Sequence, residues 1–467
     1  MIDFFPKPIG IRALTIYLCV LTAVSVIFFS NAISPEYMVM GVASVAGFFF
    51  FSYFCSWKWK DESPSVFTIY IFITAFLIRV IAMTALYFYF IVKTGIPFEF
   101  HTVDAMGYHL DAEWMASVDF ASANTYLYGT GMPLSDSGYL LYLSLLYRFF
   151  GPSIYLARLS KCLLDALSCV LVYKMASRIS NEPTARIAAI FYCFMPNLIF
   201  YCGLHLKEVE MLFLTIAAME RLSYVIHRDR VDILNSVLVA VLVFLLFSFR
   251  TVLALSVTFA VASALIFVTF QKRNAWHHVA VVVWVMLALG ILAGGTITNE
   301  ISNAWENRVE NQITKRDQQT LRGNLWAQYA TGTVMAPMMF VIPFPTMVDT
   351  DQQYTQQMLH GGNYVRNFLG IFVLIAVIEG LFFRREGQRH VIILSFVVSY
   401  LGVVCLSGYS NSERFVLPAL PFLLILAANG ITHLNEKNYH WVRIWYWIVP
   451  LMPLGWAIFK LGSRGLL

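Results

Sequence analysis

The sequence predicts an all-α polytopic membrane protein. Of its 467 residues, 59% are hydrophobic and 13% are charged, and the mean hydropathy is +0.68. Soluble domains carry about 25% charged residues, and a soluble fold of this size could not bury so much apolar surface. Many apolar runs are about 17–25 residues long, which is the length of a helix that crosses a bilayer. The runs lack the alternating pattern of β-barrel strands.

About thirteen apolar runs, each bounded by polar residues, predict membrane-spanning helices. They lie at residues 12–31, 36–55, 66–94, 155–177, 186–203, 209–226, 232–249, 251–270, 278–296, 368–383, 390–406, 416–431 and 442–461. The first run is interpreted as a retained helix, because no convincing signal-peptide cleavage site follows it. Residues 138–150 are too short to span a bilayer and are rich in aromatic side chains. We therefore expect them to form a helix along the membrane surface.

The charges of the loops orient these spans. Lysine and arginine gather in the loops on one side, which the positive-inside rule makes cytoplasmic. These residues include Lys7, Arg12, Lys58, Arg178, Arg228, Lys272, Arg385 and Lys437. The net charge of +5 reflects these loops and does not indicate nucleic-acid binding. The opposite side, periplasmic in a bacterium, then holds residues 95–137, the turn from His205 to Glu210, residues 297–367 and Ser407 to Arg414.

The chain divides into four parts on this interpretation. Residues 1–65 supply two N-terminal helices, and residues 66–296 form a transmembrane core that contains the acidic segment 95–137. Residues 297–367 form a loop outside the bilayer, with enough polar helix formers for a helix or two, and residues 368–467 supply the C-terminal helices.

The acidic segment holds the first candidate for chemistry. Its carboxylates include Asp104, Asp111, Glu113, Asp119 and Asp136. Asp104 comes just after the end of a predicted span, and Tyr108 and His109 follow it. Burying a charged side chain at a helix centre costs about 2.5–3.5 kcal/mol, so a carboxylate beside apolar helices needs a partner or a purpose. Asp111, Glu113 and Asp119 fit solvated loop charges.

Basic residues on the same side form the second candidate. Lys207, Glu208 and Glu210 stand at the start of a span; the helix dipole favours the two glutamates there but opposes the lysine. Arg250 falls between two spans with almost no loop, and Arg414 comes just before a late span. Each arginine could simply anchor a helix at the interface. Together they are also the partners that an anionic phosphate needs.

The order of these pieces resembles the GT-C glycosyltransferases. Asp104, Tyr108 and His109 are similar to the acidic first-loop motif of that superfamily. The stretch from Gly138 to Glu208 resembles the branch that contains protein O-mannosyltransferases, the lipid A aminoarabinose transferase and related RgtA/B/C/D-like bacterial enzymes. The motifs that carry this resemblance are Phe150-Gly151-Pro152-Ser153, Ala157-Arg158-Leu159, Leu171-Val172-Tyr173, Pro196, Lys207-Glu208 and Glu413-Arg414-Phe415 with Leu417-Pro418 and Pro421.

The resemblance extends over residues 66–430 without the loop 297–367, and two extra spans precede the acidic segment. It implies a GT-C-like fold with periplasmic surface helices, in the inner membrane of a bacterium, with the active site facing the periplasm. It also implies transfer of a hexosyl or pentosyl group from a polyprenyl-phosphate donor to a hydroxyl of a glycan, lipid or protein, with inversion.

The resemblance also assigns expected roles. Asp104 is the general base, and either Glu208 or Glu210 is the second acidic residue. Arg414, Lys207 and Arg250 are the candidates for binding the donor phosphate. Tyr108, His109 and Arg158 are the candidates for binding the substrate.

The sequence leaves three questions open. Asp165, deep in a predicted span, would suit a transporter or flippase of lipid-linked anionic glycans. Arginines in the large outer loop would suit an O-antigen polymerase or ligase; they are Arg308, Arg316 and Arg322. The seven cysteines form no Cys-x-x-Cys pair, so neither a metal cluster nor a disulfide framework is expected. Asp104, Glu208 and Glu210 together could still hold a divalent cation.

Overall fold

The computed structural model describes residues 2–100, 103–129, 134–227, 232–269, 283, 302, 338–350, 353–380, 387–406 and 412–466. Within these ranges every regular element is a helix, and one isolated β-bridge joins Ala32 to Val348. The elements are α1 (Lys7–Ile27), η1 (Phe29–Asn31), α2 (Pro35–Lys58), α3 (Pro64–Thr94), α4 (Val103–Ser117), α5 (Phe120–Gly129), α6 (Leu134–Phe150), α7 (Ile154–Ile179), α8 (Glu182–Phe194), α9 (Pro196–Cys202), α10 (Glu208–His227), α11 (Ile233–Phe247), α12 (Thr251–Thr269), α16 (Tyr354–Met358), α17 (His360–Ile378), α18 (Gly387–Leu406), α19 (Glu413–Val416), η4 (Leu417–Ala419), α20 (Leu420–Thr432), α21 (Glu436–Ile448) and α22 (Leu451–Gly462). The prediction of an all-α protein is confirmed for this part of the chain.

Six of these helical segments are long and apolar enough to cross a membrane. They are Lys7–Ile27, Pro35–Lys58, Pro64–Thr94, His360–Ile378, Glu413–Thr432 and Glu436–Gly462, and α8 with α9 would add a seventh that is bent by 48°. The chain therefore has the helices of a membrane protein. The count of thirteen spans stays a prediction: α11 has only 15 residues, α7 carries charged residues in its middle, and residues 278–296 lie almost wholly outside the described ranges.

The start of α17 differs from the prediction. The sequence placed the span at residues 368–383 and assigned residues 360–367 to a loop, but α17 begins at His360 and these polar residues are buried. Their side chains find partners inside the bundle: Asn363 donates to Glu413 at 2.7 Å, and Asn367 donates to the carbonyl of Pro343 at 3.1 Å. Buried polar groups are tolerated when they are hydrogen-bonded, and hydropathy alone cannot anticipate such pairs.

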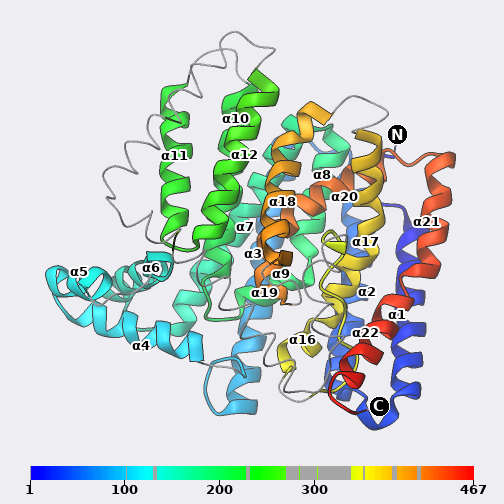
Figure 1. Cartoon of the computed structure of the whole chain (residues 1–467), viewed down its shortest axis with the longest axis horizontal. Helices are drawn as coiled ribbons and strands as arrows, with labels where there is room; N and C mark the ends of the chain where they lie inside the picture. The colour runs from blue at the N-terminus through cyan, green and yellow to red at the C-terminus, as the bar shows by residue number, and fades with distance from the viewer. Residues whose placement is uncertain are drawn as a thin grey trace.

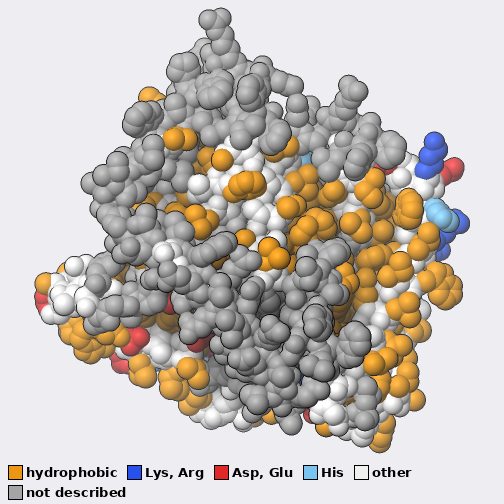
Figure 2. All heavy atoms as spheres, viewed as in Figure 1, with side chains coloured by type: hydrophobic (Ala, Val, Ile, Leu, Met, Phe, Trp, Pro, Cys, Tyr) orange, Lys and Arg blue, Asp and Glu red, His pale blue; other side chains and the backbone are white. Residues whose placement is uncertain are grey.

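Helix α7 lies at the centre of the bundle and packs against α3, α8 and α10. Figure 1 shows α10, α11 and α12 standing together on one side, with α4, α5 and α6 projecting below them as a separate layer. In Figure 2 hydrophobic side chains cover much of the described part of this face, and acidic side chains are visible around the projecting layer. The expected surface helix at residues 138–150 is the C-terminal part of α6, and much of the polar segment 95–137 folds into α4 and α5.

A buried ion pair fastens α3 to α7 beside the bend between α8 and α9. The guanidinium of Arg79 binds the carboxylate of Asp165, and both side chains are at most 1% exposed. Pro196 lacks an N–H, so the carbonyl of Tyr192 loses its usual donor four residues ahead and accepts a longer hydrogen bond, 3.4 Å, from the N–H of Met195. Arg79 also donates to this carbonyl, at 3.3 Å, and to the carbonyl of Cys193 at 3.1 Å. The ion pair thus adds side-chain donors to the backbone at the helix bend.

We expect Asp165→Ala to destabilise the protein by about 3–5 kcal/mol, because the change leaves the charge of Arg79 buried without its partner. Thermal unfolding in detergent measures the effect. Leu163→Ala is the matched control, since Leu163 is 44% exposed on the same helix. Equal melting temperatures for the two variants would contradict the structural role of the pair.

The predicted orientation also has a direct test. A cysteine introduced at Lys58, at the end of α2, should resist labelling from outside intact cells, whereas a cysteine at Glu113, exposed on α4, should be labelled. The same expectation applies to Arg228, Lys272 and Arg385 on the inner side and Asn311 on the outer side, four positions that lie outside the described residues. External labelling at Lys58 would contradict the assignment of the loops.

Candidate functional site

Three residues from distant parts of the chain meet at one guanidinium. Arg414, in α19, donates from Nη1 to Oδ2 of Asp104 at 2.5 Å and from Nε to Oε1 of Glu208. Asp104 lies in the first turn of α4, and Glu208 is the first residue of α10. The side chain of Glu208 is fully buried, whereas that of Asp104 is 51% exposed. The structure therefore brings together the three residues that the sequence predicted as base, second acid and phosphate ligand.

Arg250 adds a second cation to this group. Its Nη2 lies 3.8 Å from Oε1 of Glu208, and its guanidinium stands over the ring of Phe415 at 4.7 Å. The turn that carries Arg250 is fixed by Gly138 of α6, whose N–H donates to the carbonyl of Ser248 at 2.9 Å. A Cβ at Gly138 would come within 2.3 Å of the Ser248 hydroxyl, so only glycine permits this close approach.

Lys207 supplies the third cation. Its ammonium donates to Oδ1 of Asp136 at 2.5 Å and to the carbonyl of Ser135 at 2.7 Å. Tyr108 donates to the same carboxylate oxygen at 3.2 Å. Burial lowers the pKa of Lys207, and the adjacent carboxylate of Asp136 opposes this shift. Tyr108 and Lys207 therefore share Asp136 as a hydrogen-bond acceptor. The sequence analysis gave Asp136 no role.

We call these six residues the Arg414 cluster: Asp104, Asp136, Lys207, Glu208, Arg250 and Arg414. Three carboxylates balance three cations in this cluster. A phosphate could bind here by replacing a carboxylate as the ligand of one of the cations. Arginine suits this exchange because its fork of N–H donors matches both carboxylate and phosphate oxygens.

Glu210 faces a different partner. Its Oε2 lies 3.8 Å from Nζ of Lys161, and both side chains are buried. Lys161 also donates to the carbonyl of Leu204 at 2.9 Å and to that of Leu206. Glu208, and not Glu210, is thus the acidic residue beside Arg414. Lys161 holds the backbone just before Lys207 and Glu208, a role that the sequence analysis missed although a lysine within a predicted span is a signal of function.

His109 and Arg158 do not contact the Arg414 cluster through any of the described hydrogen bonds or ion pairs. His109 pairs through Nδ1 with the hydroxyl of Tyr147 at 2.9 Å, and this hydroxyl lies 3.4 Å from Nε2 of His205. Burial lowers the pKa of His109, although Glu113 opposes the shift, and burial also lowers the pKa of His205. Arg158 is fully buried and donates to the carbonyl of Pro97 at 2.5 Å. These contacts favour a structural role for His109 and Arg158, two of the three candidates for binding the substrate.

The sequence analysis left open a divalent cation bound by Asp104 and Glu208. In the structure the guanidinium of Arg414 lies between these two carboxylates. Among the described residues no group of three or more His, Cys, Asp or Glu side chains is arranged to hold a metal ion. None of the seven cysteines forms a disulfide. Arg308, Arg316 and Arg322 lie outside the described residues.

No known protein family matches this chain, and no curated protein matches it either. The arrangement of its own residues therefore carries the functional argument.

Proposed function

We propose that the protein is a glycosyltransferase of the GT-C type, which moves a sugar from a polyprenyl-phosphate donor to a hydroxyl of a glycan, lipid or protein. The single observation that supports this most is the double contact of Arg414 with Asp104 and Glu208. It places a half-exposed carboxylate, suited to a base, beside a cation suited to a phosphate. We further propose that the protein resides in the inner membrane of a bacterium, with this site on the periplasmic side.

Each group has a defined part in the proposed reaction. The acceptor oxygen forms a bond to the anomeric carbon of the sugar as the bond from that carbon to the phosphate oxygen breaks. Asp104 takes the proton of the acceptor hydroxyl, a role worth about 10²–10⁴-fold in rate. Arg414 and Arg250, with Lys207 nearby, stabilise the negative charge that collects on the departing polyprenyl phosphate. Attack from the face opposite the phosphate inverts the anomeric centre.

The contact between Arg414 and Asp104 also suggests an order of events. While Arg414 binds Asp104, the guanidinium occupies Oδ2 of that carboxylate. A donor phosphate that takes the place of Asp104 on Arg414 would release the carboxylate beside the acceptor. Glu208, fully buried and still paired with Arg250, would keep the guanidinium in position. The base would thus become available only when the donor is bound.

A transporter or flippase is the main rival function. The deep carboxylate that favoured it, Asp165, is bound to Arg79 and also accepts a hydrogen bond from Tyr192. These partners indicate that Asp165 holds helices together and does not line a transport path. Glycosyl transfer and lipid flipping therefore need to be measured on one sample.

The test uses liposomes that contain the purified protein and a polyprenyl-phosphate sugar labelled in the sugar. We expect the label to move to added hydroxyl acceptors while polyprenyl phosphate is released in equal amount. Flipping is followed in the same liposomes with a fluorescent polyprenyl phosphate. Movement of the lipid across the bilayer without any transfer to a broad panel of acceptors would contradict the proposal and favour the transporter.

A further inference from the structure

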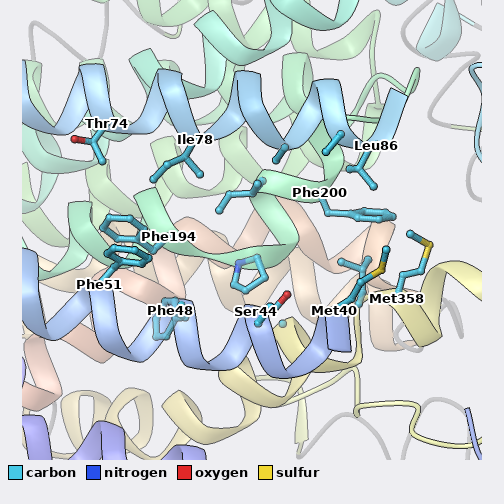
Figure 3. Close-up of a pocket in the computed structure, with 18 of the residues that line it drawn as sticks. Met40, Ser44, Phe48, Phe51, Thr74, Ile78, Leu86, Phe194, Phe200 and Met358 are labelled. Atoms are coloured by element: carbon cyan, nitrogen blue, oxygen red, sulfur yellow. The ribbon is translucent and has the colours of Figure 1, made fainter. Parts of the chain in front are cut away.

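An apolar groove lies between α2 and α3, and residues of α8 and α9 also line it. Its volume is about 740 Å³. Figure 3 shows Ile78 and Leu86 of α3 on one wall, Phe48 and Met40 of α2 on the other, and Phe200 of α9 between them. Helix α2 packs against α8 and α17, whereas α3 packs against α7 and α9. The two walls are thus held apart, and α8 and α9 form the floor.

The dimensions and chemistry of the groove fit a hydrocarbon chain. Its lining runs along α2 from Met40 to Cys55, which at 1.5 Å per residue is about 23 Å. The hydrocarbon core of a bilayer is about 30 Å thick. Apart from Ser44 and Thr74, the lining is built from apolar side chains, glycine and Cys55. Phe51 and Phe54 are each 43% exposed at the rim, so the groove faces the surroundings of the bundle.

Charged residues stand at one end of this groove. The lining positions of α3 end at Leu86, and Lys93 lies seven residues further on the same helical face. On α2 the lining begins at Met40, and Glu36 lies one turn before it. Lys93 and Glu36 form an ion pair at 2.8 Å, and their side chains are 40% and 37% exposed. The lining residues of α3 are therefore followed by a cation, Lys93, and those of α2 are preceded by an anion, Glu36. Both charged side chains are partly exposed.

We propose that the groove binds one acyl chain of a phospholipid whose headgroup carries a primary ammonium. The phosphate would contact Lys93, and the ammonium would donate hydrogen bonds to Glu36. A quaternary ammonium has no N–H to donate, and a glycerol headgroup offers only neutral hydroxyls. Tyr89 donates to Glu36 at 3.4 Å, but only a primary ammonium both donates to this carboxylate and replaces the positive charge that Lys93 withdraws when it binds the phosphate. The pair thus selects a zwitterionic, ethanolamine-type headgroup over choline and glycerol headgroups. The lipid would join the N-terminal pair of helices to the rest of the bundle.

The first experiment places the full-length protein in nanodiscs with a phosphatidylethanolamine that carries a photoreactive group on one acyl chain. We expect cross-links to concentrate on groove residues and to be displaced by unlabelled phosphatidylethanolamine. Ala82→Trp fills the groove and should abolish these cross-links. Ile81→Trp is the matched control on the same helix, because Ile81 is 69% exposed and does not line the groove. Equal labelling of the Ile81 face and the groove would overturn the proposal.

The second experiment tests the headgroup. Competition by phosphatidylethanolamine should exceed that by phosphatidylcholine or phosphatidylglycerol, and Glu36→Gln should remove this preference while cross-linking persists. If polyprenyl phosphate displaces the label and phosphatidylethanolamine does not, the groove belongs to an isoprenoid chain and the phospholipid assignment is wrong. Both experiments measure binding alone, so their outcome is independent of whether the protein transfers sugars.

Discussion

Replacing Asp104 with asparagine is expected to abolish sugar transfer while the protein still inserts, folds and binds its lipid donor. Asparagine keeps the shape of the side chain and can accept a hydrogen bond, but it cannot take a proton from the acceptor hydroxyl. The loss should therefore appear in kcat, by about 10²–10⁴-fold, with little effect on donor affinity. Because Asp104 is 51% exposed, the substitution buries no new polar group. Steady-state transfer in liposomes measures the effect.

The matched control is Glu113→Gln on the same helix, where the side chain is exposed and outside the Arg414 cluster. Its turnover should remain close to that of the unmodified protein. If Asp104→Asn stays active while Glu208→Gln or Glu210→Gln is inactive, the base lies at the start of α10 instead. If all three variants stay active, the glycosyltransferase proposal fails and the transporter gains support.

Arg414→Ala is expected to lower kcat/KM for the donor by about 10²–10³-fold, the usual cost of removing a group that stabilises developing negative charge. Arg414→Lys should recover only part of this loss. Arginine reaches Asp104 and Glu208 through two separate nitrogens, whereas lysine offers a single ammonium. Initial rates over a range of donor concentrations measure both variants.

Protein abundance and melting temperature need to be measured beside these rates, because the alanine variant leaves the buried Glu208 with Arg250 alone. The lysine variant keeps the positive charge and separates loss of folding from loss of phosphate binding. Turnover of a folded Arg414→Ala protein equal to that of the unmodified chain would assign Arg414 a structural role and move the phosphate site to Lys207 or Arg250.

The sequence predicted the main members of the site but not how they pair. Asp104, Glu208, Arg250 and Arg414 all stand where an apolar run meets a polar break, and this pattern placed them on one side of the membrane. The choice between Glu208 and Glu210 could not be made from the sequence, because both lie in the first turn of one helix. It depends on Lys161, which comes from a different helix.

The fold was predictable to a similar extent. Long apolar helices such as α1, α2 and α3 can be predicted from hydropathy alone. Helix α7 is also predicted, as the span 155–177, but hydropathy does not show how distant partners neutralise its charges: Asp165 by Arg79, and Lys161 by backbone carbonyls and Glu210. In the first turns of α17, Asn363 and Asn367 are likewise buried with distant partners, Glu413 and the carbonyl of Pro343. Such pairings join residues far apart in the chain, and no local sequence pattern predicts them.

We propose that the Arg414 cluster binds phosphate and that Asp104 and the donor phosphate compete for Arg414. Equilibrium binding of polyprenyl phosphate to the purified protein tests it most directly, with the unmodified chain, Asp104→Asn and Arg414→Ala compared in the same detergent. We predict that Asp104→Asn binds at least as tightly as the unmodified chain, because the competing carboxylate is gone, and that Arg414→Ala binds at least about ten-fold more weakly, as expected for the loss of a charge-assisted contact. Equal affinity for Arg414→Ala, or much weaker binding by Asp104→Asn, would contradict the claim.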